Sequence, residues 1–294
     1  MSDFFQYLMI GLGNGAIYAM LALGLVVIYR ATGLLNFAQG ELAMFATFVV
    51  WTVNQHGVPL FPAMLVGVVA GFVIGAIVHQ VVVRPFGDPH EKPLTVVIVT
   101  IGLFLGINAL AQLIWGTGTK SLDPLFGSGQ IQVFGVGVAW QKIGALAVLA
   151  VEALIFYLIF QHSKLGLAMR AVASNPESAG LVGVPVTRML MIGWGLAAAI
   201  GAVAGTFTAP DRGMDSNLML LVLIYALAAV TLGGFDSLVG AVVGGLIVGV
   251  VTEVIRPYVD FVNKSPLLPV FVLILVVLLV RPQGLFGSKQ VNRV

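Results

Sequence analysis

The chain has 294 residues, of which 59% are hydrophobic and only 9% are charged, and its formal net charge is +2. A soluble domain carries about 25% charged residues, so this chain has too little charge to cover a surface that faces water. The small net charge argues against a nucleic-acid-binding protein, and the lack of cysteine excludes disulfides, thiolate metal sites and cysteine nucleophiles. We therefore expect an all-α polytopic membrane protein.

Apolar segments of roughly 17 to 25 residues are long enough to cross a bilayer as helices and predict the spans. In chain order they are 4–29, 37–53, 59–83, 94–115, 141–160, 189–209, 217–234, 238–255 and 266–280. This gives about eight to nine transmembrane helices. The segments 37–53 and 266–280 are short, so either could be re-entrant.

Glycine is abundant, with 36 residues, and it recurs in an ordered way. Gly67, Gly71 and Gly75 repeat every four positions, and so do Gly240 and Gly244. Small residues at this spacing let the backbones of two membrane helices approach closely. The pattern predicts a dense, Gly-rich helix bundle rather than a chemical site.

The stretch GLLNFAQGELAMF, residues 33–45, places Asn36, Gln39 and Glu41 within six positions of an otherwise apolar region. One interpretation is a helix start that Asn36 caps, with Glu41 near the positive end of the helix dipole. The other is that these polar side chains line the inner mouth of a permeation path. The two interpretations are compatible.

Two further carboxylates lie inside predicted spans, where a charge is costly and usually faces the bundle interior or water. Glu152 stands in the middle of LAVEALIFYL without an obvious local partner, and it is a fourth candidate for the path. Glu253 precedes Arg256 by three positions on the same helical face, which predicts an ion pair near the membrane interface.

The distribution of Lys and Arg predicts the orientation, because cytoplasmic loops carry the excess of these residues. With the N-terminus outside, the cytoplasmic side receives Arg30, Arg84, Lys92, Lys164, Arg170, Arg188, Arg281, Lys289 and Arg293. The outer side receives Lys120, Lys142, Arg212, Arg256 and Lys264. The connection 116–140 then lies along the outer surface, and the connection 161–188, with two helical patterns divided at Asn175 and Pro176, lies in the cytoplasm.

Several chemical motifs are absent. GTGTKS, residues 116–121, is not a phosphate-binding loop, because Thr119 stands where the pattern requires a glycine before the lysine. The four histidines, His56, His79, His90 and His162, are dispersed, which argues against a metal site. We expect no catalytic residues, no metal and no cofactor in this chain, and hence a protein that is not an enzyme.

Three separated motifs give the chain its resemblance to a known family. NFAQGE (36–41) follows the first long helix, GLAMRAVASNPESAGLVGV (166–184) follows the fifth span, and RPQGLFG (281–287) follows the last. In these motifs and their order the chain resembles the permeases of branched-chain amino acid ABC importers, of the LivH type. Gln39 stands where many members carry histidine.

The resemblance implies an ABC importer permease fold, with residues 1–294 forming a single transmembrane permease domain in the bacterial cytoplasmic (inner) membrane. Residues 161–188 would be its cytoplasmic coupling segment. The implied partners are a second permease subunit, either a paralogue or a second copy, two cytoplasmic subunits that bind the ATP, and an extracytoplasmic substrate-binding protein. Lipid surrounds the chain, and no nucleic acid is involved.

The coupling segment resembles the general ABC-importer pattern E-A-A-x-x-x-G, here with Glu177, Ser178, Ala179 and Gly183. A short helix that ends at a glycine between two spans can be gripped by a soluble partner and moved as a lever. We expect the small Ser178 and Ala179 to allow close docking, and Arg170 and Glu177 to supply charged contacts at the edges.

The resulting prediction is a permease subunit without its own ATPase site that carries leucine, isoleucine or valine across the membrane. Related permeases carry urea, amides and other small solutes, so those substrates stay open. An ion- or proton-coupled secondary transporter is the main alternative, with Glu41, Glu152 and Glu253 as coupling carboxylates. The sequence reveals no broken helices in matched positions, which argues against this alternative. An uncoupled channel would not need a docking helix.

Overall fold

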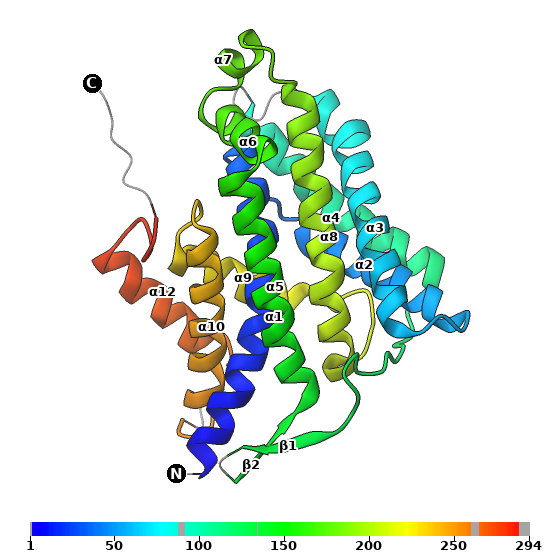
Figure 1. Ribbon diagram of the computed structural model, residues 1–294, viewed down its shortest axis with the longest axis vertical. Helices are drawn as coiled ribbons and strands as arrows, with labels where there is room; N and C mark the ends of the chain where they lie inside the picture. Colours follow the sequence, from blue (N-terminus) through cyan, green and yellow to red (C-terminus); the bar gives the residue numbers. More distant parts are fainter. Residues whose placement is uncertain (1, 88–91, 134, 260–264, 288–294) are drawn as a thin grey trace.

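The described chain is built almost entirely of helices (Figure 1). The computed structural model describes residues 2–87, 92–133, 135–259 and 265–287, so Lys264, Lys289, Arg293 and His90 lie outside the described residues. The elements are α1 (Ser2–Thr32), α2 (Gln39–Gln55), α3 (Leu60–Val78), the π-helix η1 (His79–Val83), the 3₁₀-helix η2 (Arg84–Phe86), α4 (Pro93–Trp115), β1 (Gln130–Val133), β2 (Val136–Ala139), α5 (Trp140–His162), α6 (Lys164–Ser174), α7 (Pro176–Leu181), α8 (Val186–Arg212), α9 (Leu220–Gly233), α10 (Leu238–Ile255) and α12 (Leu268–Val280). The two strands pair antiparallel.

Six of the described helices are long and apolar enough to cross a membrane, namely α1, α3 with its extension, α4, α5, α8 and α10. They fall where the sequence predicts spans. The helices α9 and α12 are apolar but short, with 14 and 13 residues. At a rise of about 1.5 Å per residue, each is only about 20 Å long, against a hydrocarbon core of about 30 Å.

Two helices form the centre of the bundle. The most apolar window of both α1 and α8 is 83% buried, whereas the corresponding windows of α3, α4 and α5 are 28%, 22% and 33% buried. The exposed faces of those outer helices carry large apolar side chains, among them Val69, Leu105 and Leu154. Such faces are suited to lipid, because lipid tails do not require polar side chains.

The helices α2 and α9 both begin part-way along the bundle and not at one of its ends. The side chain of Gln39, the first residue of α2, donates to the carbonyl oxygen of Ala197, near the middle of α8. A Cβ placed on Gly40 would lie 3.5 Å from the carbonyl oxygen of Met219, which directly precedes α9. The two helix starts therefore meet at about half the depth of the bundle. The expectation that broken helices in matched positions are absent was wrong.

These two half-helices belong to an inverted arrangement of the chain. The segment α1–α2–α3–α4 and the segment α8–α9–α10–α12 each follow the order long helix, half-helix, long helix and final helix. The helix α2 runs parallel to α8, since Ala43 lies against Gly201 and Thr47 against Gly205. The helix α9 runs parallel to α1, since Tyr18 lies against Tyr225 and Tyr29 against Phe235. The helix α1 is itself antiparallel to α8. Repeats of inverted topology are common in transporters.

Glycines make the matched helix contacts close, as their spacing predicts. In the contact of α3 with α8, a Cβ on Gly71 would lie 2.8 Å from the carbonyl oxygen of Ala198. In the corresponding contact of α1 with α10, a Cβ on Gly15 would lie 2.8 Å from the carbonyl oxygen of Gly245. Real Cβ atoms do not approach a backbone this closely, so both contacts depend on residues without side chains.

The two ends of the bundle differ. The short helices α6 and α7 project from one end, and the β1–β2 hairpin lies at the other end (Figure 1). Arg170 belongs to α6, and Arg84 and Arg188 line a pocket with Gly180 of α7, so these three predicted cytoplasmic residues lie at the α7 end. Lys142 and Arg212 lie at the hairpin end. The connection 116–140 contains the hairpin and is joined to the segment after α8 by a bridge between Lys120 and Met214.

Candidate functional site

The polar stretch 33–45 forms the return of the chain from the end of α1 into the bundle interior. The N-cap of α2 is Ala38 and not Asn36, so the predicted cap was wrong by two residues. Instead, the side-chain oxygen of Asn36 accepts from the backbone N–H of Ala38 at 3.0 Å. Asparagine favours such local turns because its side chain imitates a backbone carbonyl. Asn36 is 1% exposed, so it shapes the turn and does not contact a solute in this conformation.

Gln39 ties the start of α2 to the central helix. Its Nε2 donates to the carbonyl oxygen of Ala197 at 2.8 Å, and the residue is completely buried. That carbonyl group belongs to α8. The glycines Gly201 and Gly205 of α8 allow α2 to pack closely against it. The amide therefore fixes the depth at which α2 begins.

Glu41 lies in the first turn of α2 and joins three elements. Its Oε2 accepts from Asn108 Nδ2 on α4 at 3.2 Å, and the same Nδ2 donates to the carbonyl oxygen of Ser216 at 2.8 Å. Gln112 Nε2 donates to Asn108 Oδ1 at 2.6 Å. Ser216 belongs to the segment that leads into α9, so one amide connects both half-helices with α4.

The two helix starts explain why the Glu41 carboxylate can be buried here. Each helix N-terminus carries about half a positive charge, formed by its unpaired N–H groups. Glu41 is only 3% exposed and lies in the first turn of α2, close to the start of α9. The two positive ends offset part of the cost of burying it. The dipole interpretation of Glu41 is thus consistent with the structure.

We expect Asn108→Leu to destabilise the folded chain by about 1.5–3 kcal/mol, the usual contribution of a hydrogen bond to a charged group. The substitution removes the donor to Glu41 and separates α4 from both half-helices. Thermal unfolding of the purified protein in detergent measures the effect. Leu105→Ala, on the exposed face of the same helix, is the control and should unfold near the wild-type temperature. Equal unfolding temperatures for all three proteins would contradict this assignment.

Glu152 lies apart from the other three path candidates. It is 8% exposed in the middle of α5, which packs mainly against α1 and not against α2 or α4. Its Oε2 has no hydrogen-bond partner among the described residues. The four side chains therefore do not converge on one site.

The connection 161–188 forms two short helices at the end of the bundle. Ser163 caps α6 by accepting from Gly166 N–H at 3.0 Å, and Asn175 caps α7 by accepting from Ser178 N–H at 2.8 Å. The buried side chains of Met169 and Val172 pack α6 against the hydrophobic core of the bundle. The segment is therefore held in a defined shape, unlike a flexible loop.

The predicted coupling residues differ in accessibility. Arg170, Glu177 and Ser178 are exposed. Ala179 is 3% exposed, so it supports α7 from within and is not available for the close docking expected of it. Gly183 ends the turn after α7 with φ of +87°, a conformation that favours glycine. The sequence analysis missed Leu181 and Val182, two apolar side chains of this segment that are 89% and 78% exposed.

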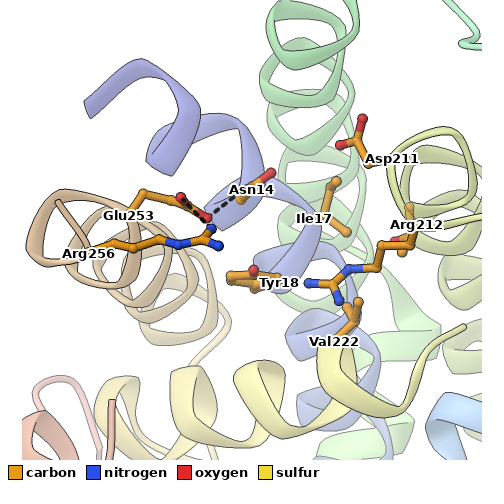
Figure 2. A pocket seen from close by; sticks show the side chains of 9 residues that line it. Asn14, Ile17, Tyr18, Asp211, Arg212, Val222, Glu253 and Arg256 are labelled. Atoms are coloured by element: carbon orange, nitrogen blue, oxygen red, sulfur yellow. Dashed lines mark hydrogen bonds and ion pairs between the residues drawn. The ribbon is translucent and has the colours of Figure 1, made fainter. Parts of the chain in front are cut away.

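A cavity of about 300 Å³ lies in the opposite half of the molecule, between α1, α8, α9 and α10. Its polar lining comes from Asn14, Tyr18, Thr208, Asp211, Arg212, Glu253 and Arg256, and its apolar lining from Ile17 and Val222 (Figure 2). The Tyr18 ring stacks on Tyr225 of α9 with 4.6 Å between the ring centroids. We call this cavity the charged pocket.

The predicted ion pair of Glu253 with Arg256 is part of this pocket. The distance from Glu253 Oε2 to Arg256 Nη1 is 3.9 Å, and the Arg256 side chain is 56% exposed, so this pair is loose. Glu253 Oε1 accepts from Asn14 Nδ2 on α1 at 2.9 Å. Lys142 on α5 donates to Asn14 and pairs with Asp211. These contacts join four helices at the hairpin end.

Arg212 is the cation of the pocket without an acidic partner among the described residues. Its guanidinium group extends from the end of α8 toward the hydroxyl group of Tyr18 (Figure 2). The sequence analysis assigned Arg212 only to a membrane end and did not single out Tyr18 or Asn14. No spacing rule could connect Arg212 with Tyr18 and Asn14, because Arg212 follows them by about 200 positions along the chain.

Comparison with known proteins identifies the family. The family described as "Branched-chain amino acid transport system / permease component" matches residues 7–280. The chain belongs to this family. It is 28% identical to the high-affinity branched-chain amino acid transport system permease protein LivH of Salmonella typhimurium, over 99% of this chain and 98% of LivH. It is 28% identical to the corresponding protein BraD of Pseudomonas aeruginosa, with the same coverage.

The chain is also similar to a permease named for another substrate. The galactofuranose transporter permease protein YtfT of Escherichia coli is 28% identical over 92% of this chain and 78% of its own length. The predicted membership in a permease family is confirmed. Among the described residues, no group of three or more His, Cys, Asp or Glu side chains is arranged to hold a metal ion.

Proposed function

We propose that this chain is the membrane-spanning permease subunit of an ATP-driven importer for branched-chain amino acids. The observation that carries the proposal is the pair of exposed apolar side chains, Leu181 and Val182, at the tip of the rigid α6–α7 segment. The relatives named as branched-chain amino acid permeases cover nearly the whole chain, which supports the substrate class. In this proposal the chain is a single membrane domain over residues 1–294 without its own ATPase site.

The proposed partners follow from the accessible surfaces. Arg170, Glu177 and Ser178 are exposed around the apolar tip, so a soluble subunit can contact all of them at once. We infer that two cytoplasmic ATP-binding subunits dock there and bind the ATP, while a substrate-binding protein delivers the amino acid at the hairpin end. A second permease subunit completes the path. The chain itself needs no cofactor.

The proposed orientation puts the α7 end in the cytoplasm of a bacterial inner membrane. The described basic residues at this end are Arg30, Arg84, Lys92, Lys164, Arg170, Arg188 and Arg281, against Lys120, Lys142, Arg212 and Arg256 at the hairpin end. Seven against four agrees with the excess of Lys and Arg on the cytoplasmic side. The N-terminus would then lie outside. The six long helices, with α2, α9 and α12, make up the eight to nine predicted crossings in this proposal, three of them short.

Movement can reach the half-helices through direct contacts. The helix α8 begins five residues after Leu181, and Gln39 and Ala43 of α2 lie against its middle. A partner that pulls α7 in one nucleotide state and releases it in another changes the balance of two bundle arrangements. Matched half-helices also occur in ion-coupled transporters. The docking segment separates the two mechanisms, since ion coupling does not require it.

Cysteine cross-linking tests the docking surface, because the chain has no cysteine of its own. With Ser178→Cys, a bifunctional thiol reagent should link the permease to its ATP-binding subunit, and an impermeant maleimide should label the site only from the cytoplasmic side. A cysteine at Lys120, at the hairpin end, is the control and should be labelled only from outside. Labelling of Ser178→Cys from outside, or cross-linking at Lys120→Cys alone, would contradict the proposal.

A further inference from the structure

The charged pocket contains opposite charges on facing walls. Arg212 extends from α8 on one side and Glu253 from α10 on the other, with Tyr18 of α1 between them (Figure 2). The Glu253 side chain is 13% exposed and therefore largely shielded from bulk water. Charged hydrogen bonds are stronger where water is excluded, which favours binding at the Glu253 wall, whereas Arg212 lies on the exposed side of the pocket. A solute that carries both a cation and an anion would satisfy both walls.

Arg212 and Glu253 differ in the interactions that they already make with other side chains of the protein. Arg212 lacks an acidic partner within the described part of the chain. Its guanidinium group has five N–H donors, so donors remain for a carboxylate beside the contact with the Tyr18 hydroxyl group. Glu253 is held by Asn14, which orients the carboxylate, but its pairing with the exposed Arg256 is loose. An ammonium group can take the place of Arg256 because that side chain is free to turn toward solvent.

The remaining walls are suited to an aliphatic group. Ile17 and Val222 line the pocket, and the stacked Tyr18 and Tyr225 rings stiffen the wall between them. A volume of about 300 Å³ is at the small end of the range for ligand pockets, about 300–1,000 Å³. The pocket therefore fits a small solute better than a sugar chain or a peptide.

We propose that the charged pocket binds the zwitterionic form of an aliphatic α-amino acid at the hairpin end of the permease. Arg212 binds the carboxylate, Glu253 binds the ammonium group, and Ile17 and Val222 contact the side chain. This inference rests on the proposed function and adds the substrate-contacting residues to it. A structural role, in which the charges only join helices, is the competing explanation.

Ligand analogues separate the two roles. The full-length chain in lipid nanodiscs is titrated with leucine, with leucinamide, which lacks the carboxylate, and with 4-methylpentanoate, which lacks the ammonium group. Arg212→Gln should weaken leucine binding about ten-fold to a hundred-fold, the range for a hydrogen bond to a charged group, and leave leucinamide binding unchanged. Glu253→Gln should weaken leucine similarly and leave 4-methylpentanoate unchanged. A structural role would weaken all three ligands equally and would overturn the proposal.

Controls keep the result interpretable. Arg84→Gln, at the opposite end, should bind leucine like the wild type. If Arg212→Gln does not fold, Arg212→Lys retains the charge without the fork and should give an intermediate loss for leucine only. Failure of the wild-type chain to bind leucine, while the complete importer takes up leucine with ATP, would overturn this inference alone. Leucine binding as described, without ATP-driven uptake by the complete importer, would overturn the proposed function instead.

Discussion

Gly75→Leu is expected to prevent the chain from accumulating as a folded protein. A Cβ at this position would meet the carbonyl group of Trp194, with the carbonyl carbon 2.9 Å away, and would meet the Ala198 methyl group at 2.9 Å. Backbone atoms of α8 cannot move aside as a flexible side chain can, and α8 is central to the bundle. We expect a loss of more than about 4 kcal/mol, in the range reached only when a core is disrupted.

The measurement is fluorescence-detected size-exclusion chromatography of a tagged chain, combined with thermal unfolding. Gly106→Leu is the matched control, because Gly106 is also inside a membrane helix but has no atom within 4 Å of the position that a Cβ would occupy. The control should elute and unfold like the wild type. A monodisperse Gly75→Leu protein with wild-type unfolding would show that α3 and α8 do not pack as described.

The double substitution Leu181→Asp with Val182→Asp is expected to abolish ATP-driven uptake without affecting membrane insertion. Each of these apolar side chains contributes about 1.5–3 kcal/mol when it is buried against a partner. Losing both should weaken docking by at least about a hundred-fold, since each factor of ten corresponds to about 1.4 kcal/mol. The new carboxylates would add the cost of desolvating two charges.

Two readouts identify the cause of the lost uptake. The ATP-binding subunits should no longer copurify with the doubly substituted permease, although the permease itself is recovered in normal amounts. Tyr258→Asp changes an exposed ring near the end of α10 and should retain the ATP-binding subunits. Normal copurification and uptake with both aspartates present would exclude the α7 tip as the docking surface.

The long helices could be predicted from the sequence, but the depth of the half-helices could not. Hydropathy reports that a segment is apolar and says nothing about where along the membrane normal it begins. Gln39 and Glu41 gave a signal for α2, because amides and carboxylates are rare in hydrocarbon. The start of α9 gave none, since Leu220 and the residues that follow are uniformly apolar.

The glycine pattern was informative because it depends only on local spacing. Gly71 and Gly75 face α8 as a four-residue period requires. The charged pocket, in contrast, depends on contacts between distant positions, such as Asn14 with Glu253, and a single sequence carries no signal for them. The interior position of Ala179 was missed because a small side chain suits a buried contact and a docking surface equally well.

We propose that ATP hydrolysis by partner subunits drives solute through this chain. The most direct measurement is leucine uptake by proteoliposomes that contain the complete importer and its binding protein. With the ATP-binding subunits facing the lumen and ATP enclosed there, we expect leucine to accumulate inside the proteoliposomes. Uptake should stop when a non-hydrolysable analogue replaces ATP, and it should continue in the presence of a proton uncoupler. Uptake that persists without hydrolysis, or that the uncoupler abolishes while ATP is present, would contradict the account.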